Sequence, residues 1–256
     1  VYAANTFGAI CGVYLALHVL IPLMGVRLSL IVAAVVDVAV GIALMRKFMT
    51  SGSRILAPVC LSAMAVSTLL AQTIGQVSVE TMTSGVFRIG RSDLPEGVTV
   101  PFYEDGKTAT VSIVASPDSS LGIMTNGKSD AGVMIDPAGR REGDEITMVM
   151  AAALPMSGRN DLRDIAVVGF GSGISTHVAL ANPKVRSVDT IEIEPVMVDA
   201  ARIFGGYNAR AYSDPRSNII INDARTQFAT GRKSYDLIVS EPSNPWVSGV
   251  ASLFTI

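Results

Sequence analysis

The first third of this chain is almost free of charge, which limits the folds open to it more than any other feature. Three apolar stretches cover residues 7–24, 28–45 and 55–74, and Asp37 is the single charged residue inside them. About 20 apolar residues span the hydrocarbon core of a bilayer, and a soluble helix would carry a polar stripe every third or fourth position. We therefore predict about three transmembrane helices over residues 1–75, with a lipid membrane as partner.

The composition agrees with a membrane part joined to a water-soluble part. Hydrophobic residues make up 49% of the chain and charged residues 16%, against ~25% charged residues in ordinary soluble domains. A net charge of −2 does not favour nucleic-acid binding, which needs a basic face. Cys11 and Cys60 both lie in apolar stretches and have no metal-ligand spacing, so we expect no metal site.

Residues 76–160 are expected to form a small β-rich domain with a linking helix. Residues 77–90, 98–106 and 107–116 alternate β-branched with polar side chains, which is typical of short antiparallel strands. Residues 104–107 and the Asn126-Gly127 pair favour tight turns between such strands. The sequence turns helical over residues 145–156, and Asp144 is the expected cap at the start of that helix.

From Asp164 onward the pattern is that of a parallel α/β sheet. Expected strands cover residues 165–171, 185–195, 217–225 and 235–243, and expected helices cover residues 174–183, 196–204 and 226–231. Strand–helix alternation at this spacing predicts a doubly wound fold. The chain begins with Val1 rather than Met and stops at Ile256. We therefore expect a piece of a longer protein, with a Rossmann-like nucleoside-binding domain over residues 161–256 that is incomplete at its C-terminal end.

Residues that follow the expected strands carry the candidate chemistry, because ligands sit at the carboxyl ends of parallel strands. The glycine loop at residues 169–173 allows a ligand to approach the backbone at a helix start. Glu192 follows about 20 positions later, where an acid binds ribose hydroxyls. Asp223 and Ala224 follow the third strand, where an Asp can accept a bond from an exocyclic amine beside room for adenine. Glu241 follows the fourth strand, at the reacting end of such a ligand.

In order, these strand ends resemble the spermidine synthase (aminopropyltransferase) family. Its members share a glycine loop, an acid–Ile–acid run, an Asp before a small residue, and a strand leading into an acidic, Pro-containing loop. The corresponding segments are GFGSG at 169–173, EIE at 192–194, NDAR at 222–225 and YDLIVSEPSNPW at 235–246. The resemblance covers roughly residues 100–256. The apolar helices ahead of it resemble a bacterial branch that fuses a multi-helix membrane region to such a domain.

The resemblance implies membrane α-helices, a small antiparallel β domain and a truncated Rossmann-like domain of the S-adenosylmethionine-methyltransferase-like type. It implies decarboxylated S-adenosylmethionine or S-adenosylmethionine as substrate, a small-molecule amine as the second substrate, and a homodimer. Glu241 falls at the position of the catalytic acid that deprotonates the attacking amine. The implied cofactor-binding residues are Gly169, Gly171, Ser172, Gly173, Glu192, Ile193, Asp223 and Ala224.

Four positions depart from the family pattern. Ser172 and Asn244 stand where the soluble enzymes have Asp, and Met148 and Met150 stand where they have Tyr and Glu. An apolar Met cannot balance a polyamine ammonium, so putrescine is not a secure acceptor. Three functions therefore stay open: aminopropyl transfer, methyl transfer from S-adenosylmethionine, and non-catalytic sensing of a nucleoside or polyamine. Nicotinamide chemistry is disfavoured because the GxGxxG spacing is absent.

Two features of the sequence give conflicting predictions for the side of the membrane on which the α/β domain lies. Arg46, Lys47 and Arg54 lie between the second and third stretches, and the positive-inside rule places this segment in the cytoplasm. A third stretch that spans fully would then put the α/β domain outside, where S-adenosyl compounds are scarce. From the ligand, we predict a multi-pass protein of the bacterial inner membrane with a cytoplasmic soluble domain.

Overall fold

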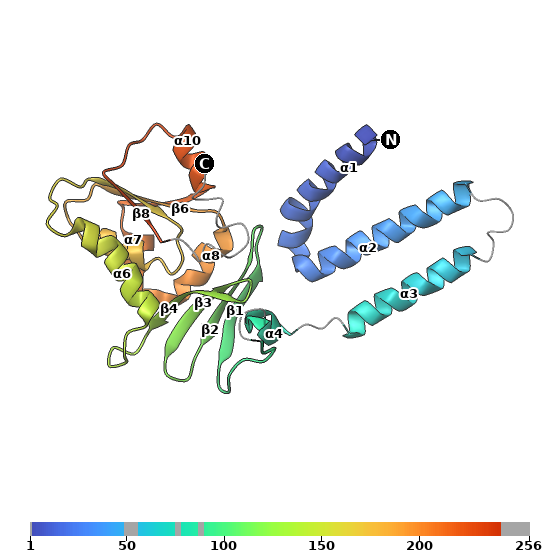
Figure 1. Cartoon of the computed structure of the whole chain (residues 1–256), viewed down its shortest axis with the longest axis horizontal. Helices are drawn as coiled ribbons and strands as arrows, with labels where there is room; N and C mark the ends of the chain where they lie inside the picture. Colours follow the sequence, from blue (N-terminus) through green and yellow to red (C-terminus); the bar gives the residue numbers. More distant parts are fainter. Residues whose placement is uncertain (1, 49–55, 75–77, 87–89, 242–256) are drawn as a thin grey trace. The chain divides into compact units, whose positions relative to one another are not determined.

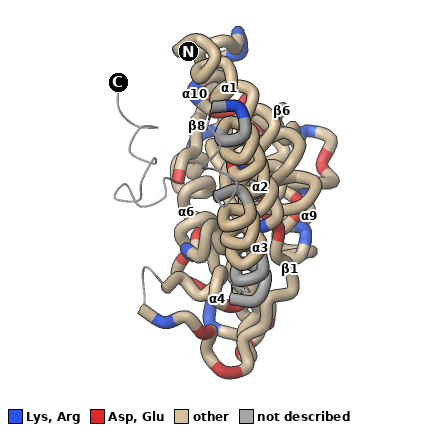
Figure 2. Tube along the Cα trace, turned by 90° about the vertical axis from the view of Figure 1, so that its right-hand side faces the viewer, with Lys and Arg blue, Asp and Glu red and all other residues tan. Residues whose placement is uncertain are grey.

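A computed structural model describes residues 2–48, 56–74, 78–86 and 90–241 of the chain (Figure 1). The chain divides into two compact units, Val1–Ser78 and Val79–Ile256. The first unit is helical and contains α1 (Tyr2–Leu15), the π-helical turn η1 (Ala16–Leu20), α2 (Ile21–Phe48) and α3 (Leu56–Ile74). Charged residues are sparse along these helices (Figure 2), and α2 and α3 lie side by side.

The helical stretch of the first unit breaks between the first two predicted spans. Gly25 has φ 74° and ψ 171°, outside the helical region, and α1 and α2 run in different directions (Figure 1). Pro22 explains the widened turn η1 just before it, because a proline ring clashes with the carbonyl four residues earlier, which is that of His18. The Ser29 hydroxyl donates to the Gly25 carbonyl at 2.6 Å, so a side chain satisfies one acceptor at the break.

Among the described residues, one helical stretch is long and apolar enough, by length and composition, to cross a membrane. It covers Tyr2–Leu44, and a shorter apolar helix covers Pro58–Ser67. Large side chains along the first stretch are exposed, with Phe7 at 70% and Leu23 at 76%. Helices occur at all three predicted spans, apart from residue 55, which lies outside the described residues; their placement in a membrane stays a prediction.

The second unit begins with a helix where the sequence predicted a strand. Residues 79–83 form α4 (Val79–Thr83), and the Ser84 amide donates to the Glu80 carbonyl at 2.8 Å, a helical i to i−4 bond. Packing explains the wrong prediction. The buried Thr83 hydroxyl donates to that of Ser112 at 3.2 Å, and a Cβ added at Gly127 would lie 2.8 Å from the Met82 carbonyl oxygen.

An antiparallel sheet follows, as predicted, and its four strands lie in sequence order. They are β1 (Thr99–Asp105), β2 (Thr110–Ala115), β3 (Ser120–Thr125) and β4 (Lys128–Met134). The Asn126-Gly127 turn is confirmed, with φ of 50° and 74° at the two positions, as a type I′ hairpin requires. The first hairpin closes two residues later than expected, over residues 106–109, where the Gly106 amide donates to the Ala109 carbonyl at 2.9 Å.

The linking helix is confirmed as α6 (Gly143–Met156), but its expected cap is wrong. Glu142 occupies the cap position and makes no side-chain cap bond, while Asp144 lies inside the first turn. The side chain of Asp144 therefore does not close the helix end. It contributes to the wall of a cavity instead.

The α/β part is a parallel sheet in the order β7-β6-β5-β8. Its strands are β5 (Asp164–Val168), β6 (Ser187–Glu192), β7 (Ser217–Ile221) and β8 (Leu237–Ser240). The helices between them are α7 (Ile174–Ala179), α8 (Pro195–Ala200), η3 (Ala201–Tyr207), α9 (Ala209–Ser213) and α10 (Ala224–Thr230). The predicted Rossmann-like alternation is confirmed, with α9 in addition. The strand order reverses between β5 and β8, which is where such sheets bind ligands.

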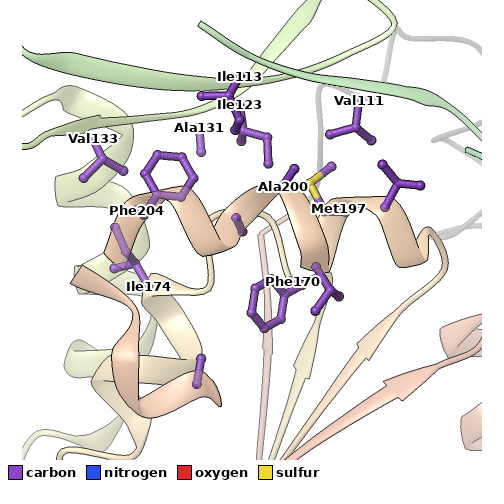
Figure 3. Packing of buried hydrophobic residues seen from close by; sticks show 14 of the residues in the cluster. Val111, Ile113, Ile123, Ala131, Val133, Phe170, Ile174, Met197, Ala200 and Phe204 are labelled. Carbon is purple, nitrogen blue, oxygen red and sulfur yellow. The ribbon is translucent and has the colours of Figure 1, made fainter. Parts of the chain in front are cut away.

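One hydrophobic core joins the antiparallel sheet to the α/β part (Figure 3). Side chains of β2, β3 and β4, such as Ile113, Ile123 and Val133, pack toward α8 and η3, which contribute Met197 and Phe204. These strand residues are fully buried. The antiparallel sheet and the α/β part therefore share one core, in which the sheet packs against α8 and η3.

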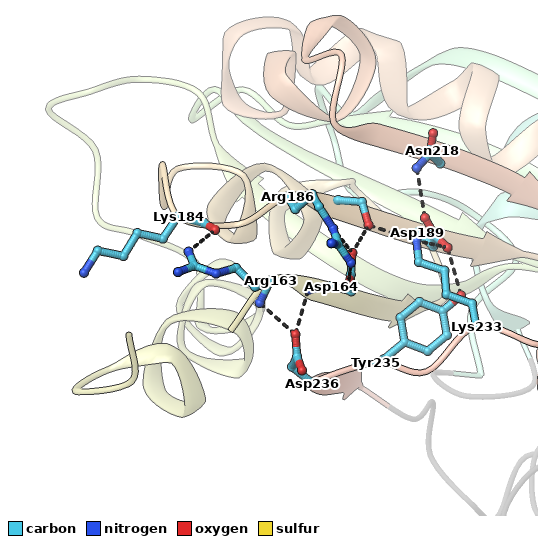
Figure 4. A network of polar contacts seen from close by, with 10 residues as sticks. Arg163, Asp164, Lys184, Arg186, Asp189, Asn218, Lys233, Tyr235 and Asp236 are labelled. Atoms are coloured by element: carbon cyan, nitrogen blue, oxygen red, sulfur yellow. Dashed lines mark hydrogen bonds and ion pairs between the residues drawn. The ribbon is translucent and has the colours of Figure 1, made fainter. Parts of the chain in front are cut away.

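Polar contacts to a buried carboxylate fix the segment that leads into β8 (Figure 4). Asp189 of β6, 5% exposed, accepts hydrogen bonds from Lys233 Nζ at 2.8 Å, the Tyr235 hydroxyl at 2.8 Å and Asn218 Nδ2 at 2.9 Å. One carboxylate thus holds residues 233–235 against the middle of the sheet.

A second carboxylate fixes the start of β8 itself (Figure 4). Asp236 Oδ2 accepts bonds from the amides of Arg163 and Asp164, at 2.8 and 2.9 Å. Asp164 in turn forms an ion pair with Arg186. With its beginning anchored on both sides, β8 delivers Glu241 to a defined place at its other end.

Candidate active site

A cavity of about 570 Å³ lies at the carboxyl ends of β5, β6 and β8, and the antiparallel sheet and α6 close its other side. The α/β part supplies Val167, Val168, Gly169, Phe170, Gly171, Ser175, Glu192, Ile193, Glu194, Met197, Val239, Ser240 and Glu241. The sheet and α6 supply Thr108, Ala109, Thr125, Lys128, Ser129, Asp130, Ala131, Asp144 and Met148. The structure thus brings Gly169, Gly171, Glu192, Ile193 and Glu241 together, as predicted.

The glycine loop presents bare backbone to this cavity. Gly169 and Gly171 have φ of 85° and 51°, and a Cβ added to either would meet no atom within 4 Å. The positive φ angles favour glycine, and the open space beside both residues is where a ligand could contact the backbone. Gly173, with φ 78°, instead occupies the cap position of α7, where a Cβ would come 2.9 Å from the Phe170 ring.

Ser172 faces the protein interior rather than the cavity. It is fully buried, and its hydroxyl lies 2.9 Å from Met148 Sδ, to which it donates. Its carbonyl accepts a bond from Asn208 Nδ2 at 2.7 Å. The predicted cofactor contact from the Ser172 side chain is therefore not what this geometry shows.

Glu192 is oriented by backbone donors on both sides. Its Oε2 accepts from the Phe170 amide at 2.7 Å, and its Oε1 accepts from the Glu194 amide at 2.9 Å. Burial raises the pKa of Glu192, and these amides partly offset the effect. Each oxygen keeps a further lone pair, so the carboxylate can accept further hydrogen bonds from a ligand in the cavity.

Glu241 and Asp144 form an acidic pair at the rim of the cavity, from the end of β8 and the first turn of α6. Partial burial and the negative charge of Asp144 raise the pKa of Glu241. A carboxylate with a raised pKa accepts a proton more readily at neutral pH. Met148 lines the same cavity, whereas Met150 is 41% exposed and is not part of the wall, so the residue at position 150 does not shape this site.

Asp223 and Ala224 lie at the end of β7 and are not in the cavity wall. Asp223 caps α10, where its Oδ1 accepts from the Thr226 amide at 2.7 Å. Its predicted contact with adenine stays a prediction. Asn244 and the rest of residues 242–256, which follow Glu241, lie outside the described residues.

Sequence reasoning missed the wall supplied by the antiparallel sheet. Lys128 and Asp130 lie two positions apart on β4 and form a buried ion pair. Glu194, 2% exposed, accepts bonds from the Thr108 amide and hydroxyl at 2.7 and 2.8 Å. The available signal was the spacing of Lys128 and Asp130, because residues two apart share one face of a strand, and charges on a half-buried face are rare.

Comparison with known proteins matches this chain to the spermine/spermidine synthase domain, to polyamine aminopropyltransferases and to putrescine N-methyltransferases. Residues 145–256 match the family model of the spermine/spermidine synthase domain. Polyamine aminopropyltransferase 2 of Streptomyces coelicolor is 25% identical over 266 residues, which cover 99% of this chain and 44% of that protein. Putrescine N-methyltransferase 2 of Nicotiana attenuata is 30% identical over 97 residues, 38% of this chain and 26% of the relative. The chain thus spans less than half the length of these curated relatives.

A solved structure shows the same fold. A spermidine synthase crystallised with the transition-state analogue AdoDATO superposes with a TM-score of 0.53 at 18% identity, covering 61% of this chain and 50% of that one. The matched domain includes most of α6 and the whole parallel sheet, and the aminopropyltransferase relative aligns along nearly the entire chain. On these grounds residues 145–256 form a domain of the spermine/spermidine synthase family.

Proposed function

We propose that this protein transfers an aminopropyl group from decarboxylated S-adenosylmethionine to an amine. One observation carries the proposal. Glu192 and Glu241, at the ends of β6 and β8, line one cavity with the open backbone of Gly169 and Gly171 between them. This reaction needs three groups from the protein: an acid that binds the diol, open protein backbone that the ligand can contact, and a proton acceptor.

The donor substrate fits the residues at the strand ends. The Glu192 carboxylate would accept from the ribose hydroxyls, and Ile193 would contact the nucleoside, since it lines the cavity with 52% of its surface exposed. Gly169 and Gly171 would border the sulfonium tail, and Gly173 would fix the start of α7 beneath it. Asp223 and Ala224 at the end of β7 are the proposed adenine contacts.

Glu241 is the proposed base. The amine nitrogen attacks the aminopropyl carbon bound to sulfur, and the new C–N bond forms as the C–S bond breaks with its electron pair going to sulfur. The proton lost by the amine passes to Glu241, whose raised pKa suits that transfer. Asp144 opposite it would hold the amine as an ammonium before the reaction.

We also propose that the first unit anchors the enzyme in the bacterial inner membrane through several helices, with the catalytic unit in the cytoplasm. The apolar stretch Tyr2–Leu44 and the exposure of its large side chains support the anchor. The need for an S-adenosyl substrate supports the cytoplasmic side.

Methyl transfer from S-adenosylmethionine is the second candidate. Two observations favour it: putrescine N-methyltransferases are among the relatives, and Ser172 turns its hydroxyl away from the cavity. No acid in the glycine loop then selects the amino group of a decarboxylated tail.

Calorimetric binding to the full-length protein separates these candidates. Decarboxylated S-adenosylmethionine, S-adenosylmethionine and methylthioadenosine are compared, with Glu192→Ala as the site variant and the surface change Asp199→Ala as the matched control. Preference for the decarboxylated compound, lost only in Glu192→Ala, supports aminopropyl transfer. Preference for S-adenosylmethionine supports methyl transfer, and binding of none of the three contradicts both.

A further inference from the structure

The carboxylates in the cavity differ in how far their charge is already compensated. Glu192 accepts two backbone amides. Glu194 accepts from the Thr108 amide and hydroxyl, from the Ala109 amide at 3.3 Å, and from the Val196 amide at 3.1 Å. Hydrogen bonds from several amides stabilise an anion without any cation. Neither residue therefore needs an ammonium group from a ligand.

Asp130 is compensated by a cation. Lys128 forms an ion pair with it, and the two side chains are only 10% and 16% exposed. Both residues line the cavity, from the same face of β4. An ammonium group that approached Asp130 would therefore also meet the charge of Lys128 where little water screens it.

Asp144 and Glu241 are the remaining acids of the cavity wall. Within the described residues, no Lys or Arg forms an ion pair with either of them. Among the described residues that line the cavity, a ligand cation thus gains a negative partner where α6 meets β8. Met148 lies in the same wall and supplies an apolar thioether surface.

We propose that the amine acceptor of this protein carries a single ammonium group on an apolar chain, and that Lys128 excludes acceptors with a second one. The proposal rests on the proposed aminopropyl transfer and gives its substrate class. The Asp144–Glu241 pair holds the reacting nitrogen, and the alkyl part contacts the side of the cavity that contains Met148. A second ammonium would lose its hydration and find Lys128 instead of an unpaired carboxylate, which is unfavourable.

Two probe amines of equal chain length test the proposal: n-butylamine with one ammonium and 1,4-diaminobutane with two. Binding of each to the full-length protein is measured by calorimetry in the presence of methylthioadenosine, and transfer is measured separately with decarboxylated S-adenosylmethionine. The wild-type protein is expected to bind the monoamine about tenfold more tightly than the diamine, the size expected for one desolvated charge contact.

Lys128→Met then tests the role of the lysine. Loss of its charge removes the cation that a second ammonium would meet, so the diamine is expected to gain about tenfold in affinity while the monoamine changes little. Lys128→Arg is the matched control, because it keeps the positive charge and should not produce that gain. The comparison of the two amines in the wild-type protein keeps the test informative where Lys128→Met folds poorly.

The possible results separate the inferred ligand class from the proposed function. Diamine binding as tight as monoamine binding in the wild-type protein, unchanged in Lys128→Met, would overturn the inference, and so would a cavity that binds neither amine in either protein. Monoamine preference without transfer to any amine would contradict the proposed function, yet leave the ligand class assigned here intact.

Discussion

Glu194 and Thr108 are 86 positions apart in sequence, and the Thr108 amide donates to Glu194 Oε2 at 2.7 Å. This contact ties the hairpin of the antiparallel sheet to the start of α8. Glu194 also caps α8 through Val196, and its own amide donates to Glu192. The residue proposed to bind ribose is thus linked to the opposite wall of the cavity through one buried carboxylate.

Replacing Glu194 is expected to destabilise the protein and weaken nucleoside binding together. Glu194→Ala leaves the amides of Thr108, Ala109 and Val196 without their acceptor, at a cost of about 2–4 kcal/mol in the free energy of unfolding. Urea titration followed by circular dichroism measures this cost. Asp199→Ala, on the same helix with its side chain 68% exposed, should stay within about 0.5 kcal/mol of wild type. Equal effects of the two changes would contradict the role given to Glu194.

A substitution at Gly106 in the β1–β2 hairpin tests the contact between this hairpin and Glu194. A Cβ at this position would lie 2.2 Å from Glu194 Oε1 and 2.3 Å from its Cδ. Because hydrogen bonds hold that carboxylate in place, Gly106→Ala should destabilise the protein by about 1–3 kcal/mol. Gly143→Ala is the control, since a Cβ there meets nothing within 4 Å. A neutral Gly106→Ala, measured by the same urea titration, would show that Glu194 can move without loss.

Asp144 should influence the pH at which Glu241 becomes protonated and can no longer act as the base. Its negative charge is one of the causes that raise the pKa of Glu241, so Asp144→Asn should lower that pKa. Glu241 would then stay ionised to lower pH, and the acid limb of the kcat profile should move toward lower pH. The profile is recorded at saturating amine, because Asp144 is also proposed to bind the substrate. Glu142→Gln, a neighbouring acid outside the cavity wall, should leave the limb in place; an unmoved limb in Asp144→Asn would argue against Glu241 as the base.

Asp189 is expected to contribute stability that depends on pH. Burial disfavours its charge, but hydrogen bonds from Lys233, Asn218 and Tyr235 outweigh this effect and lower the pKa of Asp189. Its contribution is therefore complete above the unfolded pKa of about 3.9 and is lost as the pH falls through the folded value. Asp189→Asn should cost about 1–3 kcal/mol at pH 7 and progressively less in acid.

Tyr235→Phe removes one of the three donors to Asp189 and should cost about 1 kcal/mol at pH 7. Urea titrations at several pH values compare this variant and Asp189→Asn with wild type. A difference between Asp189→Asn and wild type that stays constant down to pH 2 would mean that the charge of Asp189 contributes no stability.

The part of the site that lies on the parallel sheet could be predicted from the sequence. A strand followed by glycines and a strand followed by an acid are local patterns, and the parallel topology brings their carboxyl ends to one edge. Gly169, Glu192 and Glu241 meet there for that reason. The strand expected at residues 77–90 is wrong at residues 79–83, where alternation over five residues fits a helical turn as well and Thr83 packs against Ser112.

The opposite wall could not be predicted in the same way. Lys128 and Thr108 reach the cavity only because the β1–β4 sheet packs on α8, and no local pattern encodes a contact between residues so far apart in sequence. Ser172 shows the same limit on a smaller scale. Its position in the glycine loop suggested a ligand contact, while the nearby Met148 Sδ and Asn208 turn it into the interior.

The core shared by the β1–β4 sheet and the α8–η3 helix also limits how this protein can be recombined. A chimera that joined this sheet to the α/β half of a relative would place Ile113, Ile123 and Val133 against side chains of another shape than Met197 and Phe204. Mismatched volumes in a packed core cost stability whether they leave space or crowd it. An exchange that avoids this mismatch therefore has to carry the β1–β4 sheet together with α8 and η3.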